Sequence, residues 1–307
     1  MNGFLNILKP PGMTSHDVVA YIRKLFPRIK IGHGGTLDPG AAGVLPILLG
    51  RTTRLASFLQ EFPKIYRAEL YLGISTDTGD SFGNITSRSL PPSLGREEIE
   101  GFFSAFIGEV EQVPPMFSAV KSRGKKLYEY ARRGQEVERP SRMVIIYTLS
   151  IICFFPPEKI LFTVKCSSGT YVRSLCEQLG DAIGCGGHMS FLLRTDNGAF
   201  HLGASHTLEE LAELARAGKA GDVLLPPDYP FRDGRQIVLD NEEFKLLRSG
   251  RQLSLTRFSK REGNFPEPVD GKLLAVYTTK GDFAALARWM ATEKDSFVLK
   301  PEKIWQQ

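Results

Sequence analysis

A stretch dense in turn-forming residues, LLPPDYPFRDG at positions 224–234, most constrains what this chain can fold into. Proline fixes φ and donates no backbone hydrogen bond, so neither a helix nor a central strand passes easily through such a stretch. The chain has 307 residues, which is enough for two hydrophobic cores. We therefore expect a larger domain over residues 1–231 and a smaller one over residues 232–307.

The apolar pattern of the larger part changes repeatedly between the period of a helix and that of a strand. Helices are expected after the N-cap Thr14 or Ser15 and in the segments TTRLASFL, GREEIEGFFSAFIG, TYVRSLCEQLGDAIG and TLEELAELARAG. Strands are expected at residues 65–74, 143–155 and 160–166. After residue 232 the short runs RQIVL, RQLSL, KLLAVYT and FAALARWM indicate a small, mainly β domain.

Composition argues against several classes of protein. The four cysteines (Cys153, Cys166, Cys176 and Cys185) form no CxxC pair, so their spacing favours neither a zinc site nor a disulfide framework. The longest apolar run, residues 143–155, is too short to cross a bilayer. Met1–Phe4 is followed by polar and proline-rich sequence, unlike a signal peptide. We expect a cytoplasmic protein that has no metal and no membrane partner.

The positive charge is concentrated in one segment, residues 121–142. It holds eight Lys or Arg and three Glu, an excess equal to the net charge of +5 of the whole chain. The part KKLYEYARRG predicts a short helix with a basic face, and its tyrosines alternate with cations. Such a surface suits a folded nucleic acid, although a solvated helix without a partner has the same pattern.

A single carboxylate, Asp38, stands in the glycine-rich stretch GHGGTLDPGAAG (residues 32–43), which runs directly into the apolar segment VLPILLG. Asp followed by Pro is a common helix start, so Asp38 could simply be an N-cap. Alternatively, the small residues after Pro39 allow another chain to lie against the backbone. A lone carboxylate of that kind suits attack at, or electrostatic shielding of, a sugar carbon whose glycosidic bond breaks.

The stretch GHGGTLDPGAAGVLPILLG resembles the catalytic motif of the TruB family of tRNA pseudouridine synthases. Four further motifs resemble the same family in the same order: ILKPPGMTSHDVV, KIYRAELYLGISTDTGDSFG, QVPPMFSAVKSRGKKLYEYARRG, and SSGTYVRSLCEQLG followed by CGGHMSFLLR. The resemblance covers residues 7–194 and implies an α+β pseudouridine synthase fold with a mixed, mainly antiparallel sheet. It also implies a small C-terminal PUA-like domain that binds RNA, and LLRSGRQL (246–253) is similar to a segment of it.

The resemblance implies an activity: isomerisation of uridine 55 in the tRNA T-loop to pseudouridine. The glycosidic bond breaks, the uracil turns, and the base rejoins the ribose through carbon. Neither atoms nor electrons are gained, so no cofactor is needed. The implied partner is the T-arm of tRNA, bound by a monomer through the basic segment 121–142. Whether the aspartate adds to the sugar or removes a ribose proton is left open by the sequence.

The resemblance also implies roles for individual residues. Asp38 matches the catalytic carboxylate, Tyr66 the tyrosine that stacks on the target base, and Arg173 the arginine that pairs with the aspartate. We expect Arg173 to reach Asp38 directly, because a guanidinium keeps its charge and can hold a carboxylate through two hydrogen bonds.

Three further residues match substrate-binding positions of the family. His33 matches a histidine that braces the flipped nucleotide, and Leu192 matches an apolar wall of the pocket. Tyr171 lies two residues before Arg173, and in a strand these two side chains would share one face. From the residues alone, both tyrosines could be core aromatics and His33 a turn residue.

The chain departs from the family pattern at two positions: Gly40 stands where a bulkier residue is common, and Ala42 where a hydroxyl or thiol is common. Rival interpretations are a guide-dependent enzyme acting on ribosomal RNA, a non-catalytic RNA-binding or RNA-folding protein, and a metal-dependent hydrolase. The chain reaches KPPG within its first twelve residues, which favours a stand-alone enzyme over the first rival. An intact Asp38, Tyr66 and Arg173 argue against the second.

Overall fold

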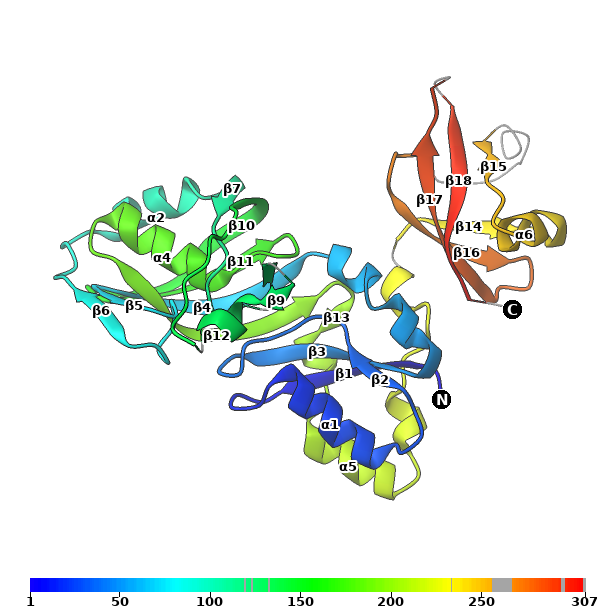
Figure 1. Cartoon of the computed structure of the whole chain (residues 1–307), viewed down its shortest axis with the longest axis horizontal. Coiled ribbons are helices and arrows are strands. Elements are labelled where there is room, and N and C mark those ends of the chain that lie inside the picture. The colour runs from blue at the N-terminus through cyan, green and yellow to red at the C-terminus, as the bar shows by residue number, and fades with distance from the viewer. Residues whose placement is uncertain are drawn as a thin grey trace.

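The protein is represented by a computed structural model, which describes residues 1–118, 120–122, 124–131, 133–232, 234–255, 267–293 and 296–305. Two large sheets organise it, one for each of the expected parts of the chain (Figure 1). In the described part, no helix is long and apolar enough to cross a membrane.

The larger sheet has nine strands in the order β1-β3-β12-β4-β11-β10-β7, with β2 added to β3 and β13 added to β12. Their bounds are β1 Gly3–Lys9, β2 Ile31–His33, β3 Ala42–Leu49, β4 Lys64–Leu72, β7 Gly108–Gln112, β10 Arg142–Phe155, β11 Lys159–Cys166, β12 Gly187–Asn197 and β13 Phe200–His201. The β3–β12 pair is parallel and the other pairs are antiparallel. The expected mixed, mainly antiparallel sheet is therefore confirmed.

Helices cover the two halves of this sheet separately (Figure 1). The helices α2 (Arg96–Ser104) and α4 (Val172–Ile183) pack into the apolar cluster of β4, β10, β11 and β12. The helices α1 (Ser15–Leu25) and α5 (Leu208–Arg216) pack into the cluster of β1 and β3. Thr14 caps α1 and Thr207 caps α5 through full capping boxes.

The two halves join where β3 begins. The parallel contact is only two residue pairs long, Ala42 with Leu193 and Gly43 with Arg194. Gly43 has φ +122°, and a Cβ there would lie 2.2 Å from the carbonyl oxygen of Arg194. Only glycine combines that conformation with so close a backbone approach. The loop that carries Asp38 leads directly into this junction.

The C-terminal part forms a five-stranded sheet in the order β14-β16-β17-β18-β15 around the buried Trp289. Its elements are β14 Gln236–Leu239, α6 Asn241–Arg248, β15 Leu253–Ser254, β16 Leu273–Thr278, β17 Phe283–Ala291 and β18 Phe297–Ile304. An apolar cluster joins the two sheets: Phe4, Val44 and Phe200 belong to it with Ala275 and Leu286. The turn-rich stretch supplies Phe231 to the same cluster.

One expected helix is replaced by shorter elements, and the short helix expected in the basic segment is present. Residues 52–59 form parts of two 3-10 turns, η1 (Gly50–Leu55) and η2 (Phe58–Glu61). Side chains bind the carbonyls at both ends of this segment: Thr52 Oγ1 donates to Leu49 O at 2.7 Å, and Lys64 Nζ donates to the carbonyls of Leu59, Gln60 and Phe62. In the described part of the basic segment a single short helix forms, α3 (Leu127–Ala131), after the hairpin β8 (Lys121–Ser122) and β9 (Lys125–Lys126).

The remaining elements are the hairpin β5 (Ile74–Thr76) and β6 (Ile85–Arg88) and the 3-10 turns η3 (Leu202–Ala204), η4 (Ala220–Val223) and η5 (Tyr229–Phe231). The hairpin extends past the larger sheet, and the turn between its strands reaches back toward the junction: Asp80 bridges to Met189 of β12. This return places the β5–β6 turn next to the loop that carries Asp38.

Candidate active site

Asp38 lies in a loop, residues 34–41, between β2 and β3, and it does not cap a helix. After Pro39 the chain makes a turn, in which Ala41 N donates to Asp38 O at 3.1 Å, and then enters β3. Every residue of β3 after Ala42 is buried. The apolar run therefore anchors the loop in the core, and the N-cap interpretation of Asp38 is wrong.

Arg194, on β12, holds the first half of the loop. Its side chain is 1% exposed, and its guanidinium donates to the carbonyls of Gly35 (3.3 Å), Thr36 (3.3 Å) and Val44 (2.8 Å). Asn197 on the same strand donates to Gly34 O at 3.3 Å. These bonds satisfy carbonyls that a glycine-rich loop would otherwise leave without partners.

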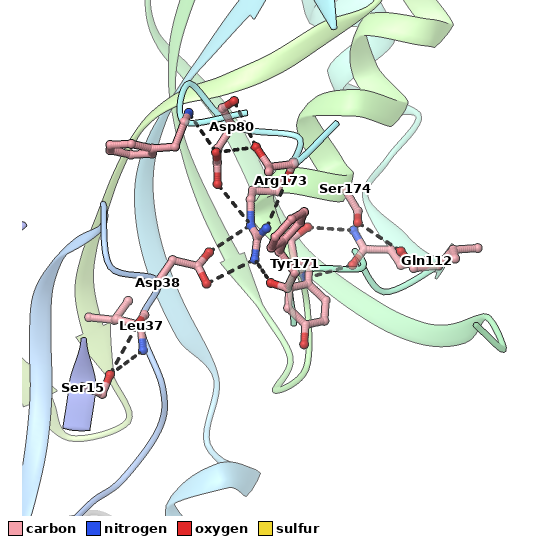
Figure 2. A network of polar contacts seen from close by, with 12 residues as sticks. Ser15, Leu37, Asp38, Asp80, Gln112, Tyr171, Arg173 and Ser174 are labelled. Atoms are coloured by element: carbon pink, nitrogen blue, oxygen red, sulfur yellow. Dashed lines mark hydrogen bonds and ion pairs between the residues drawn. The ribbon is translucent and has the colours of Figure 1, made fainter. Parts of the chain in front are cut away.

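Lys9, at the end of β1, holds the second half. It has no exposed surface, and its ammonium donates to Pro10 O (2.8 Å), Pro39 O (3.2 Å) and Ala41 O (2.7 Å). Burial lowers the pKa of Lys9 to about 8, and the nearby Asp38 carboxylate opposes this shift. Between the two cations, Ser15 Oγ accepts from Leu37 N at 2.9 Å (Figure 2). The backbone on both sides of Asp38 is thus fixed.

Arg173, in the first turn of α4, meets Asp38 directly, as expected (Figure 2). Arg173 Nε lies 2.9 Å from Asp38 Oδ2, and Nη2 donates to Oδ1 at 3.1 Å. The guanidinium also donates to Thr78 O (3.1 Å) and Phe117 O (2.9 Å). The Arg173 side chain is 3% exposed and that of Asp38 is 33% exposed, so the carboxylate reaches solvent and its partner does not.

The protonation of Asp38 reflects opposing influences. Burial raises the pKa of Asp38, the Arg173 guanidinium lowers it, and the Asp80 carboxylate raises it further. The balance lies above the ordinary value of a carboxyl group. Asp80 also faces the guanidinium, with Oδ2 3.8 Å from Arg173 Nε, so two carboxylates share one buried cation (Figure 2).

Tyr66 and Leu192 contribute apolar surface beside the loop that carries Asp38. Leu192, on β12, is buried in the cluster that contains Leu37 and Ala41, which flank Asp38 in the loop. Tyr66, on β4, packs against that cluster. Burial raises the pKa of Tyr66, the Arg194 guanidinium opposes this, and the Asp38 charge adds to the rise. Tyr66 is therefore within electrostatic reach of Asp38.

Tyr171 is the N-cap residue of α4, so the strand-like alternation that would place it on one face with Arg173 is wrong. The two side chains nevertheless meet, because the Arg173 guanidinium lies 6.0 Å from the Tyr171 ring centroid. Arg142 lies closer to the same ring, at 4.9 Å. Gln112 fixes the backbone here, since it accepts from Tyr171 N at 3.0 Å and donates to Tyr171 O at 3.2 Å.

His33 ends β2, at the entry to the loop. It is half-buried, and its ring meets that of His16 edge-on with the centroids 5.2 Å apart. Burial lowers the pKa of His33, and the neighbouring His16 and Arg194 lower it further. The lowered pKa favours the neutral form of His33, which can serve as a hydrogen-bonding or stacking group.

Sequence reasoning missed three residues of the site: Lys9, Asp80 and Arg194. Each stands in a stretch that resembles the family (KPPG, TDTGDSFG and SFLLR), but nothing in their spacing indicates that they surround one loop. Within the described residues, no group of three His, Cys, Asp or Glu side chains is placed to hold a metal ion.

Fold and site define an enzyme of the pseudouridylate synthase class, and comparisons with known proteins identify the family. Residues 23–172 match the TruB family pseudouridylate synthase N-terminal domain, and residues 173–231 match the tRNA pseudouridylate synthase B C-terminal domain. The chain belongs to the TruB family.

Two relatives and one solved structure illustrate the similarity. The tRNA pseudouridine synthase B of Pelotomaculum thermopropionicum is 44% identical over 98% of this chain and 96% of its own length. That of Caldanaerobacter subterraneus is 51% identical over 93% of this chain and 94% of its own length. A structure described as a Cbf5-Nop10-Gar1 complex is 28% identical, with a TM-score of 0.75 over 99% of this chain and 85% of the matched chain. These matches confirm the expected fold class and the class of isomerase.

Proposed function

We propose that this protein isomerises uridine 55 in the T-loop of tRNA to pseudouridine, with Asp38 as the catalytic carboxylate. One observation carries the proposal: the carboxylate of Asp38, in a fixed loop, reaches solvent and is held through two contacts by the buried guanidinium of Arg173. The names of the relatives, tRNA pseudouridine synthase B, support tRNA as the substrate.

The isomerisation breaks the bond between nitrogen 1 of uracil and carbon 1′ of ribose and forms one between carbon 5 and carbon 1′. Carbon 5 loses a proton and nitrogen 1 gains one, so the product has the composition of the substrate. Positive charge develops on the sugar as the first bond breaks, and an ionised Asp38 stabilises it. Arg173 orients the carboxylate and favours its ionised form, since its charge opposes the rise in pKa that burial causes.

The remaining site residues bind the nucleotide. Tyr66 offers an aromatic face for the uracil, and Leu192 closes the apolar side of the pocket. Tyr171 holds the ribose side next to Arg173, and His33 braces the nucleotide from the loop entrance. A flipped base needs such a set of faces because it leaves its stacking partners behind in the RNA.

Two surfaces bind the rest of the RNA in this proposal. The basic segment 121–142 contacts phosphates of the T-arm; of its cations, Arg123 and Arg132 lie outside the described residues. Residues 232–307 act as a PUA-like RNA-binding domain that adds affinity and no chemistry, while residues 1–231 form the catalytic domain. An apolar cluster joins the sheets of the two domains. The protein works as a monomer in the cytoplasm.

A second candidate, an enzyme of ribonucleoprotein particles, is favoured by one observation. A structure described as an H/ACA RNP bound to a substrate RNA containing 2'-deoxyuridine is 25% identical, with a TM-score of 0.72. The relatives named tRNA pseudouridine synthase B are more similar, at 44% and 51% identity, and favour the tRNA enzyme.

The test is to incubate the purified protein with an unmodified tRNA transcript, without metal, nucleotide or guide RNA, and to map pseudouridine. We expect conversion at position 55 by the wild type and none by Asp38→Asn, which keeps the shape of the side chain. A transcript with cytidine at position 55 is the matched control for position. Lack of conversion by a folded wild-type protein would overturn the proposal.

A further inference from the structure

Phe82 is an exposed aromatic residue beside the candidate active site. It lies in the turn between β5 and β6, and its side chain is 79% exposed. Exposing a phenyl ring forgoes favourable burial, so a ring held in the open next to a binding site is a candidate contact for a ligand.

The position of the ring is set by Gly40, two residues after Asp38. A Cβ atom at residue 40 would lie 2.1 Å from Phe82 Cε2 and 2.6 Å from Cζ, so the ring rests directly on the Gly40 backbone. Gly40 has no positive φ, which means that it is glycine here for space and not for conformation. The family commonly has a bulkier residue where Gly40 stands. In this chain the Phe82 ring fills the space that such a side chain would occupy.

The turn that carries Phe82 is tied to the catalytic pair. Asp80 Oδ1 accepts from Phe82 N at 3.0 Å and from Thr78 Oγ1 at 2.7 Å, and Asp80 Oδ2 faces Arg173. Across the turn, Asp77 accepts from Asn84 N at 2.8 Å and from its side-chain amide at 3.1 Å. The backbone that carries the ring is therefore tied to the catalytic pair, as a preformed stacking surface needs.

The charge around the ring indicates what it binds. Asp77 and Asp80 flank Phe82 and repel phosphates, whereas the neutral face of a nucleobase can stack on a phenyl ring beside them. We propose that Phe82 stacks on a nucleobase of the substrate RNA next to the target uridine, and that Gly40 is the residue that lets it do so. This inference rests on the proposed function and adds a binding residue to it.

The first experiment compares Phe82→Ala, Phe82→Trp and, as the matched control, Phe155→Ala in the kinetics of pseudouridine formation in a T-arm stem-loop. Phe155 is also an exposed phenylalanine, at 54%, but it ends β10 beside the hairpin to β11. We expect kcat/KM to fall about tenfold in Phe82→Ala, because a stacked base contributes about a factor of 5 to 150 to binding. Phe82→Trp should retain activity and Phe155→Ala should match the wild type.

The same proteins are then assayed on stem-loops that each carry one abasic nucleotide near the target. At one position the abasic RNA should lower the activity of the wild type and leave that of Phe82→Ala unchanged, since the stacking partner is already missing. If no position behaves in this way, or if Phe82→Ala equals the wild type on intact RNA, the inference is wrong while the proposed function stands. An inactive wild type would instead overturn the proposed function, and the inference with it.

The role of Gly40 is tested by a double-mutant cycle. Gly40→Ala adds a Cβ atom where the Phe82 ring lies and should displace the ring. We expect a loss of activity like that of Phe82→Ala. In the Phe82→Ala background, Gly40→Ala should have little further effect, because the clash is gone. Equal losses from Gly40→Ala in both backgrounds would contradict the coupling of the two residues. Thermal unfolding of each variant shows that the comparison concerns folded proteins.

Discussion

The loop of residues 34–41 and the basic segment of residues 121–142 both contain little regular secondary structure, but their backbones are held by different kinds of hydrogen bond. In the first, distant side chains bind the backbone: Arg194 and Lys9 together donate to the carbonyls of Gly35, Thr36, Pro39 and Ala41. In the second, the described hydrogen bonds are mainly local, such as those within residues 118–135. Its described cations include three that are exposed: Lys121, Lys125 and Arg133.

The difference follows from what each loop is proposed to do. A carboxylate that stabilises a developing charge acts best when it is already in position, because no reorganisation is then needed during the reaction. Cations that bind phosphates act by releasing counterions and need access to solvent and to the RNA. Changes in the first loop should therefore alter turnover, and changes in the second should alter binding.

The largest effect is expected from Asp38→Asn. This substitution keeps the size of the side chain and removes its charge, so turnover should fall by at least about 10⁴-fold, as when a central catalytic group is lost. Binding of tRNA, measured by filter retention, should stay close to that of the wild type. A large loss of affinity would show that the loop also serves RNA binding and would contradict the separate roles of the two segments.

Arg173→Lys should lower turnover about 100-fold, because it keeps the charge and loses the planar fork that holds Asp38. The pH profile offers a sharper measurement. Arg173 lowers the pKa of Asp38 against the effect of burial, so Arg173→Gln should shift the acid limb of the activity profile to higher pH. The matched control is Arg216→Gln, which removes the charge of an exposed arginine at the end of α5. An unshifted acid limb in Arg173→Gln would contradict the proposed pairing role.

Much of the fold could be predicted because local patterns dominate it. The capping boxes, the amphipathic helices α1, α4 and α5 and the alternating strands β4 and β11 are visible in the sequence. The helix expected at residues 52–59 was wrong: the segment forms two 3-10 turns, and side chains of Thr52, Thr53 and Lys64 bind the carbonyls that flank it. Burial of the Lys64 ammonium depends on tertiary packing, which periodicity does not report.

The candidate site also contains residues that the sequence could predict and residues that it could not. Asp38, Arg173 and the apolar residues could be predicted because a family resemblance assigns them chemical roles. Lys9 and Arg194 could not, because buried cations that bind carbonyl groups leave no charge pattern in sequence. Phe82 could not be singled out either, since its contact with Gly40 joins two turns about forty positions apart.

The basic segment should show the opposite behaviour from the loop. Lys121→Gln combined with Lys125→Gln should weaken tRNA binding about tenfold at low salt and leave turnover at saturating RNA unchanged. The slope of log affinity against log salt should become shallower by about 0.7 to 0.9 for each phosphate that the variant no longer neutralises. The matched control is Arg216→Gln with Lys219→Gln, two exposed cations in and after α5. Equal slopes for the two double variants would remove the special role of the segment.

The most direct test of the fixed loop is Lys9→Met, for which we expect a smaller loss of turnover than for the changes at Asp38 and Arg173. The substitution leaves the carbonyls of Pro10, Pro39 and Ala41 without their buried donor, so the free energy of unfolding should fall by about 1–3 kcal/mol. Turnover should fall several-fold because Asp38 is then less well positioned. Unchanged turnover in the destabilised variant would mean that Lys9 serves stability alone.

The pH dependence of stability separates this effect from simple loss of packing. The pKa of Lys9 is lowered to about 8 in the folded protein from an ordinary value of 10.5. Between these values the unfolded chain binds more protons than the folded one, so the stability that Lys9 contributes rises with pH and is lost as the pH falls through about 8. The difference in unfolding free energy between the wild type and Lys9→Met, measured in urea, should therefore grow from pH 8 to pH 10. Lys64, whose pKa is also lowered to about 8 by burial, is common to both proteins and cancels in this difference. A constant difference across the range would show that the ammonium of Lys9 is not buried against the loop.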